Sequence, residues 1–311
     1  MILYNYLQNI NNNSIDNLQI INHTSLQEIK DYEKESKFND DYNDNYNVCF
    51  IISCKYNRNY ITYIKYYVDN IIKYYTNYLV IIINNNSVYI DELIKLFNFL
   101  NYKNIIIITN NIKCKYELGG YKMGVLYLLK NNLINNYDYY IFTQDTFVLK
   151  NKYHFNIFKN NNIFAAAINV SDLPRQFVDD HLNYYITSQN ILKKINLYDN
   201  LDKIKELCYC SCFVLHKTKI KSFYNYIKNI IITNKTESIM CEFLFTRILY
   251  ELNNHNNFYI DGFSHSFNLD RDPKDYDRAA QHINNDIFSY FEKKIQGKAN
   301  DTIDSFINLM S

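Results

Sequence analysis

Short apolar runs alternate, in the first half of the chain, with segments whose apolar residues recur every three or four positions. The runs are continuous, as in strands that are covered on both faces, and lie at residues 48–53, 78–83, 105–108 and 139–142. The segments with helical spacing lie between them, at residues 60–75, 90–100 and 117–130. Because strands and helices take turns, we predict an α/β fold with a doubly wound, mostly parallel sheet and helices on both faces.

The second half of the chain is less regular. Strands are expected at residues 163–168, 210–215 and 258–260, and helices at residues 178–195, 200–207, 220–231 and 237–252. A closing amphipathic helix that ends near Gly297 is predicted from apolar residues at helical spacing, namely Tyr276, Ala280, Ile283, Ile287 and Phe291. Residues 1–46 form a predicted polar arm with one helix at residues 26–32.

The composition is that of a globular protein. At 311 residues, 48% hydrophobic and 17% aromatic, the chain is long and apolar enough to bury a sizeable core. The excess of Asn, Ile, Lys and Tyr, with 5 Gly, 2 Pro and no Trp, is typical of the coding bias of an AT-rich genome. Lys plus Arg (33) nearly balances Asp plus Glu (32), so the broad positive field that nucleic-acid binding requires is not expected.

Cysteine usage and hydropathy indicate a cytoplasmic protein. The 7 Cys form no regular framework and no apolar leader opens the chain, so we expect a reducing compartment. The longest apolar runs are far shorter than the roughly 20 residues that cross a bilayer, so no membrane span is expected.

The strand expected at residues 139–142 leads directly into a carboxylate. Thr143 and Gln144 continue it, and Asp145 follows at its end. A strand holds such a side chain rigidly at the sheet edge, and a carboxylate oxygen there is the hard ligand that a divalent cation needs. We therefore expect Asp145 to lie where a metal-bound diphosphate could be held.

Four short segments resemble, in the same order, the nucleotide-binding half of GT-A glycosyltransferases, most closely those of the family 2 type. They are the first strand with Lys55-Tyr56-Asn57-Arg58 after it, the turn IINNNS at residues 82–87, the glycine-bearing helix ELGGYKMG at residues 117–124, and Thr143-Gln144-Asp145 in the place of the D-x-D motif. The resemblance implies a nucleotide-sugar-binding half at residues 47–150, an acceptor-binding half at residues 151–270 and a helical C-terminal segment at residues 271–311.

The resemblance also assigns donor-binding residues. Ser53, Asn84 and Ser87 would contact the base and ribose of a nucleotide-diphosphate sugar, and Asn84 stands where the family usually has an Asp. A neutral amide at that position can still hydrogen-bond a base edge, because it both donates and accepts. Lys122 would lie near the diphosphate, and Gln144 would also contact the donor.

For the metal, the resemblance implies that Asp145 and His265 hold Mn or Mg. Thr143 replaces the first Asp of D-x-D, which leaves Asp145 as the carboxylate of the motif. A Gly119-Gly120 turn would help neutralise the phosphates, and Arg271 or Arg278 could reach one, although loop arginines are usually solvated.

A catalytic base is suggested by the segment ESIMCEFLFTR at residues 237–247, which resembles the acidic segment of inverting members. Glu242 is the best match and would accept the proton of the acceptor hydroxyl. Glu237 and Asp261 are alternatives, and a retaining enzyme would need no such base.

Cys208, Cys210 and Cys212 alternate on an expected strand, which would put them on one face. Zinc sites usually draw ligands from turns such as C-x-x-C, so we expect buried thiols here.

Taken together, these features predict a glycosyltransferase that moves a sugar from a nucleotide-diphosphate donor to a glycan or protein acceptor with the help of a divalent metal. Two alternatives remain open. One is a catalytically degenerate GT-A-like binding or structural protein, and the other is a nucleotidyltransferase, because strand-end Asp sites occur in unrelated chemistries.

Overall fold

The computed structural model describes residues 18–21, 46–55, 61–145, 147–149, 152, 155, 163–169, 193, 206–254, 264–267 and 291–294. Its first half has the alternation that the apolar pattern predicts. The elements are β2 (Val48–Cys54), α1 (Ile61–Tyr74), β3 (Tyr78–Asn84), α2 (Ile90–Phe99), β4 (Ile105–Thr109), α3 (Tyr116–Lys130) and β5 (Tyr139–Gln144). The prediction of an α/β fold is confirmed.

The remaining elements come from both ends of the chain. They are β1 (Leu18–Ile21), β6 (Phe147–Leu149), β7 (Ile163–Asn169), β8 (Glu206–His216), α5 (Lys217–Ile227), α6 (Lys235–Leu252), β9 (Ser264–Phe267) and β10 (Phe291–Lys294). The strands near residues 163 and 210 and the helices near residues 220 and 237 are confirmed. The expected helices at residues 26–32 and 178–195, the strand at 258–260 and most of the closing helix lie outside the described residues.

Three predicted boundaries are wrong. The helix expected at residues 200–207 cannot include its last two residues, because Glu206 and Leu207 pair with β7. The closing helix cannot include Phe291, which begins β10 and pairs with both β6 and β9. The helix expected at residues 220–231 ends at Ile227, and Ile230 donates its N–H to the Ile227 carbonyl at 3.0 Å in the turn that follows. In the first two cases, ladder partners from distant parts of the chain outweigh the local helical spacing.

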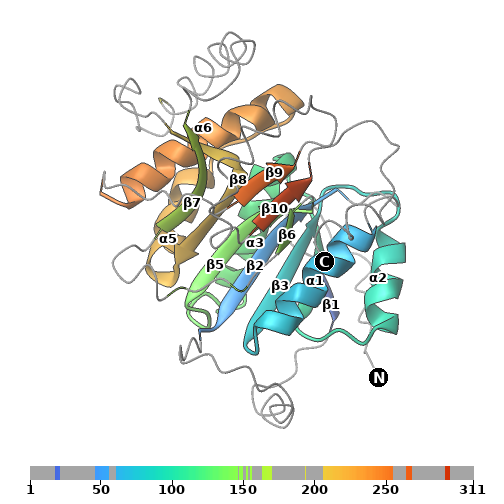
Figure 1. Cartoon of the computed structure of the whole chain (residues 1–311). Coiled ribbons are helices and arrows are strands. Elements are labelled where there is room, and N and C mark those ends of the chain that lie inside the picture. The colour runs from blue at the N-terminus through green and yellow to red at the C-terminus, as the bar shows by residue number, and fades with distance from the viewer. Residues whose placement is uncertain are drawn as a thin grey trace.

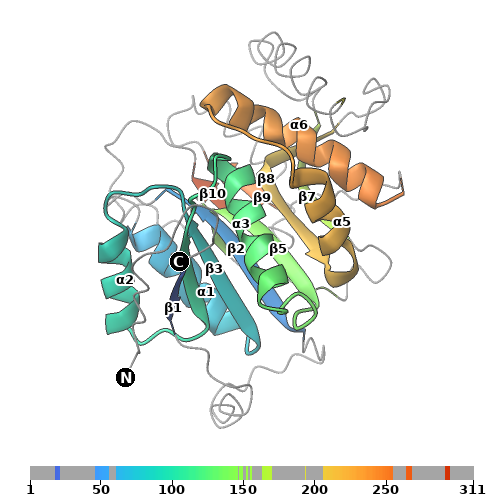
Figure 2. The same cartoon turned by 180° about the vertical axis from the view of Figure 1, so that it is seen from behind.

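The main sheet has seven strands in the order β1-β4-β3-β2-β5-β8-β7. The central strands β4, β3, β2 and β5 are parallel, and antiparallel pairs extend the sheet on both sides. Figures 1 and 2 show the two faces of this twisted sheet. Strand β1 lies within the predicted polar arm and pairs antiparallel with β4, so that part of the arm belongs to the sheet.

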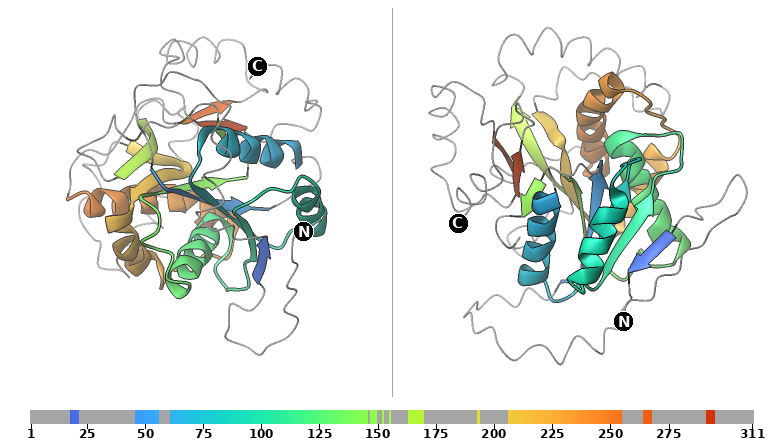
Figure 3. Two further views of the ribbon diagram at one scale, coloured as in Figure 1. Left: turned by 90° about the horizontal axis from the view of Figure 1, so that it is seen from below. Right: turned by 90° about the vertical axis from the view of Figure 1, so that its right-hand side faces the viewer.

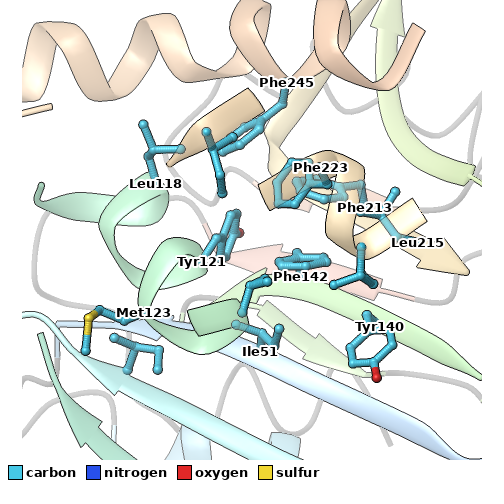
Figure 4. Close-up of a cluster of buried hydrophobic side chains, with 14 of the residues drawn as sticks. Ile51, Leu118, Tyr121, Met123, Tyr140, Phe142, Phe213, Leu215, Phe223 and Phe245 are labelled. Carbon is cyan, nitrogen blue, oxygen red and sulfur yellow. The ribbon is translucent and has the colours of Figure 1, made fainter. Parts of the chain in front are cut away.

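Helices cover both faces, as Figure 3 shows, and each face has its own core. One cluster joins α1 and α2 to the sheet, and the other joins α3, α5 and α6 to the opposite face. The second cluster is centred on aromatic rings (Figure 4), with Phe142 stacked on Phe213 at 4.7 Å and Tyr121 edge-on to Phe142 at 5.1 Å. No helix among the described residues has the length and hydropathy to cross a membrane.

A bulge in β8 reverses the expected facing of its cysteines. Ala165 pairs with Phe213 and Ala167 with Cys208, so a step of two residues on β7 spans five on β8. Ser211, within this bulge, has a left-handed backbone with φ of 57°. In a regular strand, residues five apart face opposite sides, but the bulge puts Cys208 on the same side as Phe213. Cys208 therefore belongs to the core on the α3 side, whereas Cys212 belongs to the core on the α1 side. The prediction of a shared face is therefore wrong for Cys208 and Cys212, but both residues are buried, as expected.

We expect the protein to lose stability in alkali. Burial raises the pKa of Cys49 and Cys241 well above 9.0, and that of Tyr67 and Tyr121 well above 10.0. Above about pH 9 the unfolded chain therefore binds fewer protons than the folded one, and the free energy of unfolding falls as pH rises. Lys122, whose pKa is lowered by burial, acts in the opposite direction, but it is one group against several. Urea midpoints measured between about pH 7 and about pH 10 test this, and a constant or rising midpoint would contradict it.

Candidate functional site

The central parallel strands end at one edge of the sheet, and the polar residues singled out from the sequence meet there. Ser53 of β2 is in register with Gln144 of β5, and the next residue, Cys54, is in register with Asn84 of β3. In open α/β sheets, ligands bind outside the carboxyl ends of the strands. This edge is therefore the candidate site, and the backbone brings Ser53, Asn84 and Gln144 together there.

Asp145 lies in the turn directly after β5. Its N–H donates to the Ser53 carbonyl at 3.0 Å, which extends the β2–β5 ladder by one bond. Its Oδ2 accepts a hydrogen bond from the backbone N–H of Lys55 at 2.7 Å. The half-buried carboxylate is thus held at the carboxyl ends of two neighbouring strands, and the same contact also caps β2.

Thr143, which takes the place of the first D-x-D aspartate, does not lie at this edge. Its side chain is fully buried, and its hydroxyl is 2.8 Å from the hydroxyl of Tyr67 on α1. A strand alternates its side chains between the two faces, so position 143 points into the core on the α1 side. Within the motif, Asp145 therefore provides the carboxylate.

A buried amide network joins three strand ends to the start of α3. Asn85 donates to the Ser53 hydroxyl at 2.9 Å and accepts from the Asn110 amide at 2.7 Å. Asn110 also donates to the Cys114 carbonyl at 2.9 Å. The carbonyl of Tyr116 accepts from both Asn85 and Ser53 at 3.3 Å. These contacts fix the ends of β2, β3 and β4 relative to one another.

Tyr116 itself has a left-handed backbone, with φ of 56°. For a bulky residue this conformation costs of order 1–3 kcal/mol and persists only where the surroundings hold it. The two hydrogen bonds to its carbonyl do so. Tyr116, Asn85 and Asn110 were not identified from the sequence, because an asparagine after a strand carries no signal in a chain so rich in Asn.

The turn after β3 is shaped by Asn84. This residue is 2% exposed, and its Oδ1 accepts from the backbone N–H of Ser87 at 2.8 Å. Asn86 between them has a left-handed backbone with φ of 59°. The Ser87 hydroxyl oxygen is buried and has no hydrogen-bond partner among the described residues. The turn thus keeps the oxygen of the Asn84 amide occupied and leaves one polar group unsatisfied at Ser87.

Lys122 is buried in α3, and its ammonium donates to the Ile230 carbonyl at 2.7 Å. Desolvation lowers its pKa. The only described contact of the ammonium thus goes to the segment between α5 and α6. Gly119 and Gly120, expected to form a turn, instead lie inside α3, where an added Cβ would come within 2.2 Å of the Cys114 carbonyl and 2.6 Å of the Ser53 hydroxyl, respectively. Gly120 thus allows the helix to approach β2 closely, and Gly119 allows it to pack against the loop that precedes it.

Glu242 belongs to a row of α6 residues at i, i+4 spacing, which lie on one side of a helix. Ser238, one turn before it, donates to the Glu117 carboxylate of α3 at 2.6 Å. Thr246, one turn after it, accepts from the backbone N–H of Cys208 in β8 at 2.5 Å. Ser238 and Thr246 are buried, whereas Glu242 is half-buried. Glu242 therefore lies between the start of α3 and the β8 bulge, with access to solvent.

The alternative base Glu237 has a structural role. It closes a capping box with Asn234 at the start of α6, and its carboxylate accepts from Thr233 N–H at 2.7 Å. The hydrogen bond from Thr233 N–H is the main cause that lowers the pKa of Glu237. The other alternative, Asp261, and the arginines Arg271 and Arg278 lie outside the described residues.

His265 lies in a second, three-stranded sheet of order β6-β10-β9. Strand β6 starts two residues after Asp145, β10 pairs with β6, and His265 is in register with Glu292 on β10. One strand, β10, thus separates the strand that contains His265 from β6, which follows Asp145 in the chain. The side chain of His265 lies outside the described part of the structure, and among the described side chains no group of three His, Cys, Asp or Glu forms a metal site.

No known protein family matches the chain, and no curated protein sequence does. The apo structure of the WbbM bifunctional glycosyltransferase is similar over 88% of this chain, with 12% identity and a TM-score of 0.45, and this chain spans 51% of its length. A glycosyltransferase involved in the glycosylation of the major capsid of PBCV-1 is similar over 85% of this chain and 98% of its own, with 7% identity and a TM-score of 0.38. At these values neither similarity carries an argument, and the fold rests on the strands and helices described above.

Proposed function

We propose that the protein is a glycosyltransferase that moves a sugar from a nucleoside-diphosphate donor to a glycan or protein acceptor. The observation that carries the proposal is the position of Asp145 at the carboxyl edge of the parallel strands. Asp145 follows Gln144, which is in register with Ser53 of the neighbouring strand. It is supported by the resemblance of four segments to GT-A glycosyltransferases, which fall, in this fold, on β2, β3, α3 and β5.

The nucleoside would bind at the ends of β2 and β3. Ser53 and Gln144 lie at this edge, and the Ser87 hydroxyl is a buried group that lacks a partner among the described residues. A donor nucleotide would supply that partner, and an unmade buried hydrogen bond costs of order 1–3 kcal/mol. Asn84 would act mainly through the turn that it holds, because its amide oxygen already accepts from Ser87 N–H.

A divalent cation would be held by Asp145, together with His265 from β9. The carboxylate of Asp145 fits such an ion, because it is a hard oxygen ligand fixed at the sheet edge. When bound, Mn or Mg would neutralise the charge of the leaving diphosphate. Lys122 would support the site indirectly, because its ammonium joins α3 to the segment between α5 and α6.

Glu242 would be the base of an inverting transfer. The acceptor oxygen would attack the anomeric carbon, the bond from that carbon to the diphosphate oxygen would break, and the acceptor proton would pass to the Glu242 carboxylate. The nucleoside diphosphate would leave with the bonding electron pair. The half-buried position of Glu242 between buried neighbours suits a group that must reach a bound acceptor.

A thermal-shift experiment with UDP, GDP and their sugars, with and without Mn, tests the donor site. We expect Mn-dependent stabilisation of the wild type, of about 2.7 kcal/mol at a hundredfold excess over Kd. Asp145→Asn should lose it although an amide oxygen can still accept from Lys55 N–H, because the charge is gone; Asp145→Ala should lose it as well.

Asp138 provides a matched control at the other end of the same strand. It precedes β5, accepts from the backbone N–H of Asn47 at 3.1 Å, and forms an ion pair with Lys217. Asp138→Asn should therefore leave the nucleotide shift unchanged. If the wild type shows no shift with any nucleotide, the protein is a degenerate scaffold, and if a triphosphate binds better than every diphosphate sugar, it is a nucleotidyltransferase.

A further inference from the structure

The β8 bulge, α3 and α6 are joined by hydrogen bonds in a closed path, and Glu242 lies on the α6 part of this path. Tyr121 of α3 donates from its buried hydroxyl to the Ser211 carbonyl in the bulge at 2.8 Å. The Cys208 N–H, also in the bulged segment, donates to Thr246 of α6 at 2.5 Å. Ser238 completes the path from α6 back to α3 through the Glu117 carboxylate.

The bulge explains why Cys208 turns to a side chain for its partner. Among the described pairs, the ladder of β5 with β8 reaches Phe142↔Phe213 and does not extend to Cys208. A backbone N–H that is buried without a partner is costly, and the Thr246 hydroxyl satisfies this one. Because β8 runs antiparallel to β5, the residues before Phe213 lie toward the carboxyl end of β5, so this contact lies toward the sheet edge at which Asp145 is found.

Thr246 uses the same hydroxyl to act on Glu242. Its Oγ1 donates to the Glu242 carbonyl at 2.7 Å, one turn back along α6. A threonine that bonds the carbonyl four residues earlier tilts that carbonyl and bends the helix locally. The backbone of Glu242 is therefore linked, through one buried oxygen atom, to the backbone of Cys208 in the bulge.

We propose that Thr246 is the positioning residue for Glu242. Because it bridges Cys208 N–H and the Glu242 carbonyl, it fixes the position of Glu242 relative to the sheet edge that would hold the donor. This inference rests on the proposed function, since it assumes that Glu242 accepts the proton of the attacking hydroxyl. Thr246 touches neither donor nor acceptor in this role and acts through the backbone of α6.

Release of the nucleoside diphosphate from UDP- and GDP-sugars, with water as the acceptor, provides the test without a known acceptor. Water oxygen attacks the anomeric carbon, the proton passes to Glu242, and the diphosphate leaves. Thr246→Val, which keeps the shape and removes the bridging oxygen, should lower the rate at saturating donor about tenfold and leave the donor KM within about twofold. Thr246→Ser, which restores the oxygen, should recover most of the rate.

Ile248→Val is the matched control, because it weakens the buried packing of the same helix without touching the bridge. It should lower Tm but not the rate. If Thr246→Val turns over like the wild type, if Thr246→Ser is as slow as Thr246→Val, or if Ile248→Val slows release equally, the positioning role is refuted. A wild type that shows the Mn-dependent nucleotide shift but releases no diphosphate refutes it as well, whereas a wild type without that shift refutes the proposed function itself.

Discussion

Glu242→Gln is expected to lower the rate of nucleoside-diphosphate release by about 10²- to 10⁴-fold, the usual contribution of a positioned general base. The amide has the shape of the carboxylate but cannot take up the proton. The fold should be little affected, because the side chain is half-buried and glutamine keeps its shape. The rate at saturating donor, with Tm measured alongside, provides the comparison.

Glu237→Gln is the control for this substitution, five residues earlier on the same helix. Its carboxylate accepts from Thr233 and Asn234 in the cap of α6, so the variant should lose stability and keep its rate. Glutamine keeps an acceptor oxygen at this third helical position, so the loss is mainly that of a negative charge near the helix N-terminus, about 0.3–1 kcal/mol. The opposite outcome, a slow Glu237→Gln and an unaffected Glu242→Gln, would move the base to position 237.

Gly119→Ala is expected to destabilise the fold by about 2 kcal/mol or more, although alanine is the better helix former by about 1 kcal/mol. The added Cβ would come within 2.2 Å of the Cys114 carbonyl oxygen and 2.7 Å of the Asn110 amide nitrogen. The carbonyl is backbone and cannot rotate away, so α3 would have to move from the loop that precedes it. Urea unfolding monitored by far-UV circular dichroism measures the loss.

Gly124→Ala, five residues further along α3, is the matched comparison. Its nearest neighbour would be a side-chain methyl of Ile51 at 2.6 Å, and a side chain can shift where a backbone carbonyl cannot. The loss at Gly124 should therefore be clearly smaller than at Gly119. Equal losses would mean that the backbone contact is not what requires glycine at position 119.

The parallel centre of the fold was predictable because each of its strands is a continuous apolar run, and burial on both faces leaves that pattern in the sequence. The strand Val48–Cys54 shows this, since all its residues are buried. The short strands β1, β9 and β10 were not predicted. Each has only 4 residues, too few for a periodic signal, and their partners are far away in the chain.

The candidate site was predictable to the extent that it follows from strand ends. Parallel strands bring their carboxyl ends to one edge, so the order of the elements was enough to place Ser53, Asn84 and Asp145 together. The side-chain partners were not predictable. Neither the contact of Lys122 with the Ile230 carbonyl nor that of Asn85 with Ser53 follows from local spacing, because each joins residues distant in the sequence.

By itself, then, the sequence determined the alternation of strands and helices and the edge at which Asp145 lies, because the periods of apolar residues record which faces are buried. The tertiary structure decided the facing of Cys208, the use of Gly119 and Gly120 as close-contact residues, and the place of Glu242 between α3 and the bulge. These features depend on the bulge in β8 and on the packing of α3 and α6 against the rest of the fold. Such long-range contacts leave no periodic pattern in the sequence.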